Sequence, residues 1–141
     1  MDFSMVEIIE LITDLYLPLS GYWAEEITTN TKAKQFLKAG FLSLDEEHKD
    51  KYKINDKGRN FLHPHIESIS LDFIKFMKSK QKSCSTDEIV NWFKTTYELK
   101  DINTAEEISE YICHNLPTYG YTAVSFYSRK TGNGYSIEET N

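Results

Sequence analysis

Residues 36–62 read FLKAGFLSLDEEHKDKYKINDKGRNFL, and this stretch predicts a helix, a β-hairpin and a second helix in succession. The helix at the start of this stretch ends at Gly40, because glycine readily adopts the left-handed backbone of a helix C-terminus. After a charged turn, the segment KYKI at 51–54 alternates lysine with tyrosine or isoleucine, as a half-buried strand does. The segment NDKGRNFL then begins a new helix, with Asn55 or Asp56 as its cap.

Three helices are predicted before the hairpin. Ser4 and Glu7 have the spacing of a capping box and precede apolar residues at helical intervals, so they predict a first helix, which Pro18 ends. The segment GYWAEEITT at 21–29 predicts a short second helix, and TKAKQFLKA at 31–39 predicts the third.

The second half of the chain repeats this order of helices. Pro64 is expected to break or bend the helix that follows the hairpin, and a new amphipathic helix then begins. Ser85 and Glu88 form a second capping box ahead of another helix. Asn103 or Thr104 is expected to cap the last helix.

A second hairpin is predicted at the end of the chain. Gly120 ends the last helix, the segment YTAVSFYS at 121–128 alternates strongly, RKTGNG supplies turn residues and YSIEE returns. The alternation places Tyr121 and Tyr127 on the same face of the hairpin, and this face is expected to be exposed to a partner.

The composition is that of a soluble globular protein, with 40% hydrophobic, 27% charged and 13% aromatic residues. No apolar run approaches the roughly 18 residues of a membrane-spanning helix, and the start of the chain lacks the basic segment of a signal peptide. Cys84 and Cys113 are too few for a disulfide framework. We therefore expect a cytoplasmic protein that has buried thiols and does not contact membranes.

The net charge of -6 is unevenly distributed along the chain. Residues 1–30 sum to -6, residues 31–65 to +3, residues 66–100 to +1 and residues 101–141 to -4. The overall acidity argues against a protein that binds nucleic acid over its whole surface, because affinity for phosphate rises with the number of lysines and arginines presented. The basic middle of the chain keeps this possibility open for one part of the molecule.

Three helices followed by a hairpin resemble the winged-helix branch of the helix-turn-helix proteins, and this order occurs twice, at 4–54 and at about 66–139. The stretch at 36–62 is similar to small bacterial and phage winged-helix proteins, in which the third helix ends in glycine, the wing returns as Tyr-x-Ile and the next helix opens Asp-x-Lys-Gly-Arg. The resemblance implies a mainly α fold with small β-hairpins (α+β). It also implies two winged-helix-like modules, at 1–62 and 63–141, packed as one compact unit.

The first module carries the residue types that bind nucleic acid. In winged helices that bind DNA, the third helix enters the major groove and the wing touches the backbone. The candidate nucleic-acid-binding residues on these elements and on the following helix are Lys32, Lys34, Gln35, Lys38, Lys49, Lys51, Lys53, Lys57 and Arg59. Ordinary solvation of lysines interspersed with acids, such as Asp45 and Asp50, explains the same pattern, and the sequence leaves both readings open.

The second module has acidic residues at the corresponding place. Helical spacing points Glu106, Ser109, Glu110 and Cys113 outward from the last helix, and carboxylates there would repel phosphates. We therefore expect a protein-contact or dimerisation surface, although glutamates near a helix N-terminus also complement the helix dipole. The candidate protein-binding residues are Glu106, Glu107, Glu110, Tyr127, Arg129 and Lys130.

No motif in the sequence predicts catalysis or a bound cofactor. The chain has no GxSxG elbow, no phosphate-binding GxxxxGK, no HExxH and no GxGxxG, and its histidines and cysteines lack the spacing of a zinc site. We therefore expect neither an enzyme nor a metal or small-molecule site. Two functions stay open: a regulator of transcription that contacts duplex DNA through the first module, and a protein-interaction module such as an acidic adaptor or inhibitor.

Overall fold

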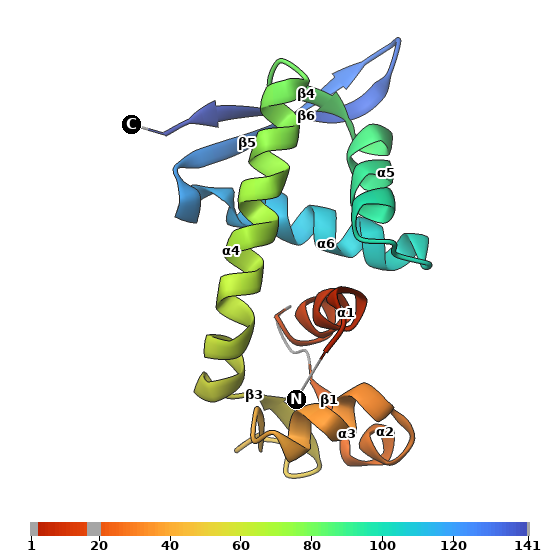
Figure 1. Cartoon of the computed structure of the whole chain (residues 1–141), viewed down its shortest axis with the longest axis vertical. Helices are drawn as coiled ribbons and strands as arrows, with labels where there is room; N and C mark the ends of the chain where they lie inside the picture. Colours follow the sequence, from red (N-terminus) through yellow and green to blue (C-terminus); the bar gives the residue numbers. More distant parts are fainter. Residues whose placement is uncertain (1–2, 17–20, 141) are drawn as a thin grey trace. The chain divides into compact units, whose positions relative to one another are not determined.

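The computed structural model describes residues 3–16 and 21–140. It divides the chain into two compact units, which we call unit 1 (residues 1–65) and unit 2 (residues 66–141). The fold is mainly helical with two small antiparallel sheets, which confirms the predicted α+β class (Figure 1). Pro18, which was predicted to end the first helix, lies outside the described residues.

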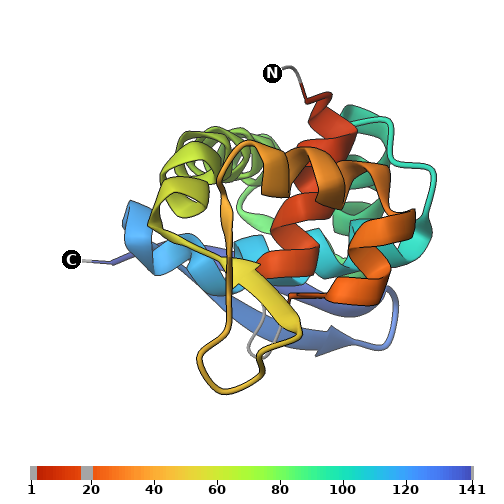
Figure 2. The ribbon, with the colours of Figure 1, turned by 90° about the horizontal axis from the view of Figure 1, so that it is seen from below.

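Unit 1 contains three helices and a three-stranded sheet. Its elements are α1 (Met5–Leu15), β1 (Tyr22–Trp23), α2 (Ala24–Thr29), α3 (Thr31–Lys38), β2 (Leu42–Leu44) and β3 (Lys51–Ile54). The sheet has the order β1-β3-β2, and Figure 2 shows the loop between β2 and β3 projecting away from α2 and α3. The helix predicted at 21–29 was too long at its start. Tyr22 and Trp23 pair with β3 as a short strand, and α2 begins only after them.

The predicted capping box at the start of the chain is present. The backbone N–H of Glu7 donates to Ser4 Oγ at 3.2 Å, and the backbone N–H of Ser4 donates to Glu7 Oε1 at 3.0 Å. These bonds satisfy amides that a helix N-terminus otherwise leaves unpaired, so α1 begins at Met5.

Asn55 joins the hairpin of unit 1 to the next helix, α4 (Asp56–Ser79). Its Oδ1 accepts from the backbone N–H of Gly58 at 3.0 Å, which makes Asn55 the cap, and its Nδ2 donates to the carbonyl of Gly40 at 2.9 Å. Gly58 has no room for a side chain, because a Cβ there would lie 2.5 Å from the carbonyl oxygen of Phe41. The NDKGR segment is therefore a packing motif that fixes the start of α4 against the hairpin.

Pro64 was predicted to break or bend the helix, and it does not break it. α4 runs through Pro64 as one helix and crosses the boundary between the two units. Proline removes the N–H that would bond the carbonyl four residues earlier, at Asn60. Both residues are exposed, so water can satisfy that carbonyl and the helix continues.

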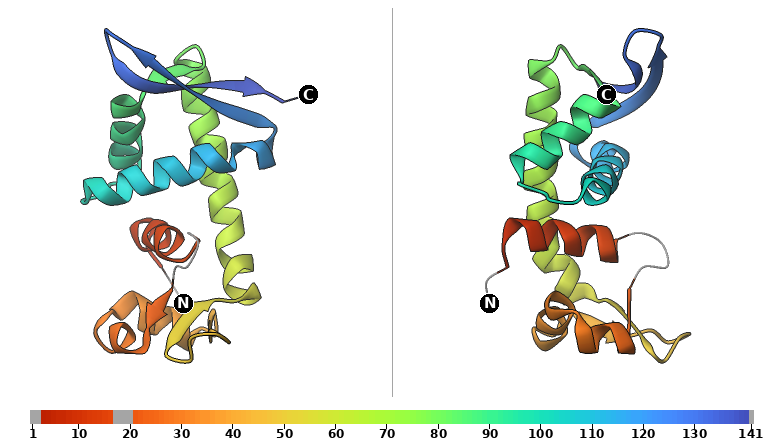
Figure 3. Two further views of the ribbon diagram at one scale, coloured as in Figure 1. Left: turned by 180° about the vertical axis from the view of Figure 1, so that it is seen from behind. Right: turned by 90° about the vertical axis from the view of Figure 1, so that its right-hand side faces the viewer.

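Unit 2 repeats the element order of unit 1. After α4 come β4 (Ser83–Ser85), α5 (Thr86–Thr96), α6 (Ile102–Asn115), a 3-10 turn (Leu116–Tyr119), β5 (Tyr121–Ser128) and β6 (Gly132–Glu139). The sheet order is β4-β6-β5. It matches the order β1-β3-β2 of unit 1, because in both sheets the last strand of the unit lies between the other two. Figure 3 shows the long β5–β6 hairpin crossing over α6.

The caps of unit 2 match the predictions in part. Ser85 Oγ accepts from the backbone N–H of Glu88 at 3.2 Å, as the second capping box predicts. The predicted cap of the last helix was wrong, because Asp101 accepts from the backbone N–H of Asn103 at 2.9 Å and α6 begins at Ile102. Gly120, with φ 86°, ends the 3-10 turn that follows α6.

Each unit has its own set of buried side chains. In unit 1, Phe36 of α3 contacts Phe41 and Phe61 edge to face, with ring centroids 4.7 and 6.1 Å apart. In unit 2, Phe73 of α4 stacks on Phe93 of α5 at 5.4 Å. Across the described residues, no helix combines the length and the apolar content that crossing a membrane would require.

Candidate protein- and nucleic-acid-binding surfaces

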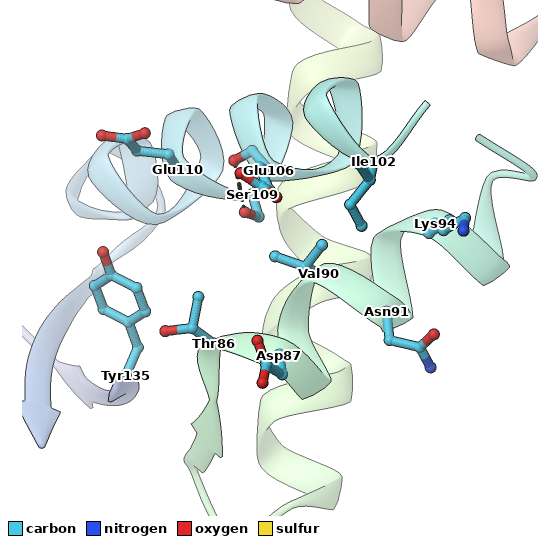
Figure 4. A pocket seen from close by; sticks show the side chains of 10 residues that line it. All are labelled: Thr86, Asp87, Val90, Asn91, Lys94, Ile102, Glu106, Ser109, Glu110 and Tyr135. Atoms are coloured by element: carbon cyan, nitrogen blue, oxygen red, sulfur yellow. Dashed lines mark hydrogen bonds between the residues drawn. The ribbon is translucent and has the colours of Figure 1, made fainter. Parts of the chain in front are cut away.

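Unit 2 has a groove of about 650 Å³ between α5 and α6, which we call the acidic groove. It is lined by Thr86, Asp87, Val90, Asn91, Lys94, Ile102, Glu106, Ser109, Glu110 and Tyr135. Figure 4 shows Val90 and Ile102 facing each other across the groove, with charged side chains around them. Ile102 is 46% exposed, although a side chain of this size is usually buried. The groove therefore combines an open apolar floor with a charged rim.

The rim of the acidic groove carries three carboxylates and one ammonium group. The carboxylates belong to Asp87, Glu106 and Glu110, and Lys94 stands at the other end. All four residues are exposed, so their charges act on whatever approaches the groove. A rim of this composition attracts cationic side chains and repels phosphates.

Tyr135 closes the acidic groove on the side of β6. Burial raises the pKa of its phenol, and neighbouring Cys113 and Glu110 raise it further. The phenol therefore stays neutral over the physiological range and remains a hydrogen-bond donor beside the Glu110 carboxylate.

A second hollow, of about 610 Å³, continues the acidic groove onto the β5–β6 hairpin. It shares Thr86, Glu110 and Tyr135 with the groove and adds residues of the hairpin, including Phe126 and Tyr127. The concave surface therefore extends from the helices of unit 2 to its hairpin.

No family model, curated protein or solved structure matches this chain.

The structure brings together some of the predicted protein-binding residues. Glu106 and Glu110 line the acidic groove, and Tyr127, which is 72% exposed, lines its continuation. Glu107 is exposed on the same helix but lines neither hollow, and Arg129 and Lys130 lie at the exposed tip of the hairpin.

Two residues predicted to face outward from α6 are buried. Ser109 is 7% exposed and Cys113 is 3% exposed, because they continue the stripe of Ala105, Ile108 and Ile112 at three- and four-residue spacing. Ser109 Oγ donates to the carbonyl of Glu106 at 2.8 Å, which satisfies its hydroxyl inside the helix. Their small side chains fit where α6 packs closely on its neighbours, so a wider face of the helix is buried than predicted.

Several groove residues could not be predicted from the sequence. Val90 and Ile102 were indistinguishable from other apolar residues at helical spacing, and Asp87 was hidden inside the second capping segment. Only the packing of α5 beside α6 shows that these three side chains share one surface.

The predicted nucleic-acid-binding residues of unit 1 fall into three groups. Lys32, Lys53 and Arg59 form ion pairs: Lys32 Nζ lies 3.1 Å from Asp14, Lys53 Nζ lies 3.4 Å from Asp45, and Arg59 Nη2 lies 2.7 Å from Asp56. These contacts use part of the positive charge that phosphates would need.

Two more lysines of this set lie over aromatic rings. Lys51 Nζ is 5.0 Å from the centroid of Trp23, and Lys57 Nζ is 5.7 Å from the centroid of Phe41. Both distances are within the range of cation–π attraction.

The remaining residues are Lys34, Gln35 and Lys38 on α3 and Lys49 in the loop between β2 and β3. The three lysines are exposed, and Gln35 is half-buried. Among the described residues, none of these four side chains has an ion pair. We call Lys34, Gln35 and Lys38 of α3 the basic surface, and Lys49 lies apart from them in the loop.

The described residues contain no group of three or more histidine, cysteine, aspartate or glutamate side chains that could hold a metal ion.

Proposed function

We propose that this protein is a non-enzymatic binding protein made of two winged helices, and that unit 2 binds a basic segment of a partner protein. The observation that carries the proposal is the acidic groove, where Ile102, 46% exposed, lies beside the buried Val90 inside a rim of carboxylates. Such a groove offers apolar contact at its centre and charge recognition at its edge, as protein-binding surfaces do.

The winged-helix assignment is supported by the order of elements. Each unit has a helix, a short strand, two helices and a hairpin, and in each sheet the short first strand pairs with the last strand of the unit. In winged helices that read DNA, the third helix is the one that faces the ligand. The corresponding helix of unit 2 is α6, and its exposed Glu106 and Glu110 favour a cationic ligand instead.

The chemistry of the partner follows from the groove. Lysine or arginine side chains would pair with the carboxylates of Asp87, Glu106 and Glu110, and apolar side chains would cover Val90 and Ile102. We expect a segment in which apolar residues are flanked by basic ones. A helix with this pattern is one common way to fill a groove between two helices.

A random peptide display library tests this proposal. We expect selection against the full-length protein to enrich peptides that combine apolar residues with lysine or arginine. Replacing two rim carboxylates, Glu106→Lys and Glu110→Lys, should weaken the binding of these peptides by about a hundredfold, because two attractive charge contacts become repulsive. Fluorescence anisotropy of labelled peptides measures the change.

Glu107→Lys is the matched control, because Glu107 lies on the same helix and is exposed but lines neither hollow. It changes the net charge in the same direction as either rim substitution and should leave affinity within a few fold. The proposal fails if no basic peptide is enriched, or if the rim variant and the control weaken binding equally.

A second candidate function is duplex DNA binding by unit 1. It is favoured by the basic surface, where Lys34 and Lys38 stand exposed on α3 without an acidic partner among the described side chains. The corresponding helix enters the major groove in winged helices that bind DNA, and lysine and glutamine are suitable contacts for phosphates and base edges.

A gel shift with duplex DNA at low salt tests this second function, because the phosphate term is largest there. The variant Lys34→Glu with Lys38→Glu should abolish the shift. Lys75→Glu with Lys100→Glu is the control of equal charge, at exposed positions of unit 2. Absence of a shift for the wild type, or an equal loss in both variants, would rule out binding through the basic surface.

A further inference from the structure

Strand β5 lies at the edge of the sheet of unit 2. The sheet has the order β4-β6-β5, so β6 occupies one side of β5 over eight residue pairs, from Tyr121–Glu139 to Ser128–Gly132. Among the described residues, no strand pairs with its other side. In an antiparallel strand, one residue directs its N–H and C=O groups to one side and the next residue directs them to the other side. Half of the backbone groups of β5 therefore point away from β6.

The sequence of β5 lacks the features that usually protect an edge strand. YTAVSFYS contains no charged residue and no proline, and eight residues make a long edge. Val124 is 43% exposed, and Ser125 beside it is exposed as well. Because neighbouring side chains point to opposite faces, both faces of the strand are open at its centre.

The other strands at sheet edges are much shorter. β1 has two residues, while β2 and β4 have three each. Short edge strands offer few backbone groups to another chain. β5 is therefore the edge of this protein best suited to pair with a further strand.

The charges on the hairpin have opposite signs at its two ends. Arg129 and Lys130 form the loop that joins β5 to β6, and Glu138 and Glu139 lie at the open end. All four residues are exposed (Figures 1 and 3 show the loop end projecting beyond the helices). If two such hairpins lie side by side in antiparallel orientation, the basic end of each is beside the acidic end of the other.

We propose that β5 pairs antiparallel with β5 of a second copy of this chain, forming a two-fold symmetric dimer with a continuous six-stranded sheet. Opposite residues of an antiparallel pair share a face, so the symmetric register places Ser125 opposite Ser125 of the second copy, at the two-fold axis, and pairs residues 122–128 with Thr122 opposite Ser128. The uncharged strand does not repel itself. At the open end the two glutamates outnumber Lys78, whose Nζ lies 5.1 Å from the centroid of the Tyr121 ring, so the ends of the hairpin attract each other. A self-complementary surface of this kind produces a closed dimer.

The reach of the charged side chains fits this register. Arg129 follows Ser128 and lies near Tyr121 of the second copy, whose neighbour on the other side is Glu139. Two strand spacings, about 10 Å, separate Arg129 from that glutamate backbone. Two long side chains can span this gap.

Sedimentation velocity of the full chain over a range of concentrations tests the dimer. We expect the mass to rise from 16.4 kDa toward twice that value as the concentration increases. Ser125→Lys should weaken the dimer at least about tenfold, because the two-fold axis brings the two new lysines together. Ser68→Lys, at an exposed position on α4, is the control and should dimerise as the wild type does.

A charge exchange tests the orientation of the two hairpins. Arg129→Glu alone and Glu139→Lys alone should each weaken the dimer, because each places like charges side by side. The double variant restores opposite charges and should restore dimerisation. Far-UV circular dichroism checks that every variant is folded.

A wild-type protein that stays monomeric at all concentrations overturns the proposal. A dimer that is unaffected by Ser125→Lys also overturns it, because pairing then uses another surface. A dimer that responds to Ser125→Lys but is not restored in the double charge variant excludes the antiparallel arrangement. Ser125 also lines the hollow that continues the acidic groove, whereas Arg129 and Glu139 line neither hollow, so the charge exchange tests the dimer independently of what the groove binds.

Discussion

Replacing Gly58 with alanine should destabilise unit 1, although alanine is the better helix former. A Cβ at this position would lie 2.5 Å from the carbonyl oxygen of Phe41, 2.8 Å from Ile54 Cγ1 and 3.1 Å from Phe41 Cβ. The nearest atom belongs to the backbone, so it cannot rotate away as a side chain could. The start of α4 must therefore move away from the hairpin.

The size of the effect follows from three contributions. Alanine in place of glycine favours a helix by about 1 kcal/mol. Overpacking of a buried position costs about 1 to 3 kcal/mol. Moving α4 also weakens the bond from the Gly58 N–H to Asn55 Oδ1, and loss of such a cap costs about 1 kcal/mol. The expected result is a net loss of about 2 kcal/mol in the free energy of unfolding.

Urea denaturation measured by tryptophan fluorescence is a suitable assay, because the chain has one tryptophan in each unit, Trp23 and Trp92. A Trp92→Phe background leaves Trp23 as the reporter of unit 1. Asn60→Ala, at an exposed position on the same helix, is the control and should change stability by less than about 0.5 kcal/mol. A Gly58→Ala variant as stable as the wild type would refute the packing role of this glycine.

Two further predictions concern hydrogen bonding and pH. Tyr22 is buried and its hydroxyl donates to Asp14 Oδ2 at 2.6 Å, so Tyr22→Phe should cost about 1.5 to 3 kcal/mol in urea denaturation, whereas Tyr127→Phe, at a 72% exposed position, should cost almost nothing. Burial, with smaller effects from nearby glutamates, raises the pKa of Cys84 to about 11 and that of Cys113 to about 12 from the ordinary 9.0. Above pH 9 the thiols lose their protons more readily in the unfolded chain than in the folded one, so the free energy of unfolding should fall as pH rises from 9 toward 11. It should fall less steeply in a Cys84→Ala, Cys113→Ala variant. An equal slope in both proteins would contradict the prediction.

The elements that the sequence predicted well are those that short-range interactions determine. Ser4 and Ser85 bind amides three residues away, and Gly40 adopts φ 83° at the end of α3. Such signals are contained in four or five consecutive residues, so they can be recognised without knowledge of the fold. The same applies to the closing hairpin, where alternation extends along the whole of β5.

The short strands β1 and β4 could not be predicted, because their partners are distant in the sequence. Tyr22 pairs with Tyr52, and Cys84 pairs with Tyr135. A segment of two or three residues has too little periodicity to show that it is a strand. Pairing with β3 or β6 gives each of them this conformation.

Ion pairs between distant elements limited the prediction of the nucleic-acid-binding residues. Lys32 looked like any other exposed lysine of α3, but its Nζ lies 3.3 Å from Glu10 and 3.1 Å from Asp14 on α1. The lysine therefore holds two helices of unit 1 together across 18 to 22 residues of sequence. Charge counted along the chain does not reveal which side chains are already paired in space.

The proposed functions give one order of elements two kinds of ligand. Packing determines the buried positions of α3 and α6, where Ala33 and Phe36 in one helix and Ala105 and Ile108 in the other share the three-residue spacing of a core stripe. Exposed positions are not restricted by packing, so α3 can carry lysines and α6 can carry glutamates without a change of fold. We therefore expect a few exposed side chains to decide what each unit binds, and exchanging charge on α6 alone should change what unit 2 binds while its core stays intact.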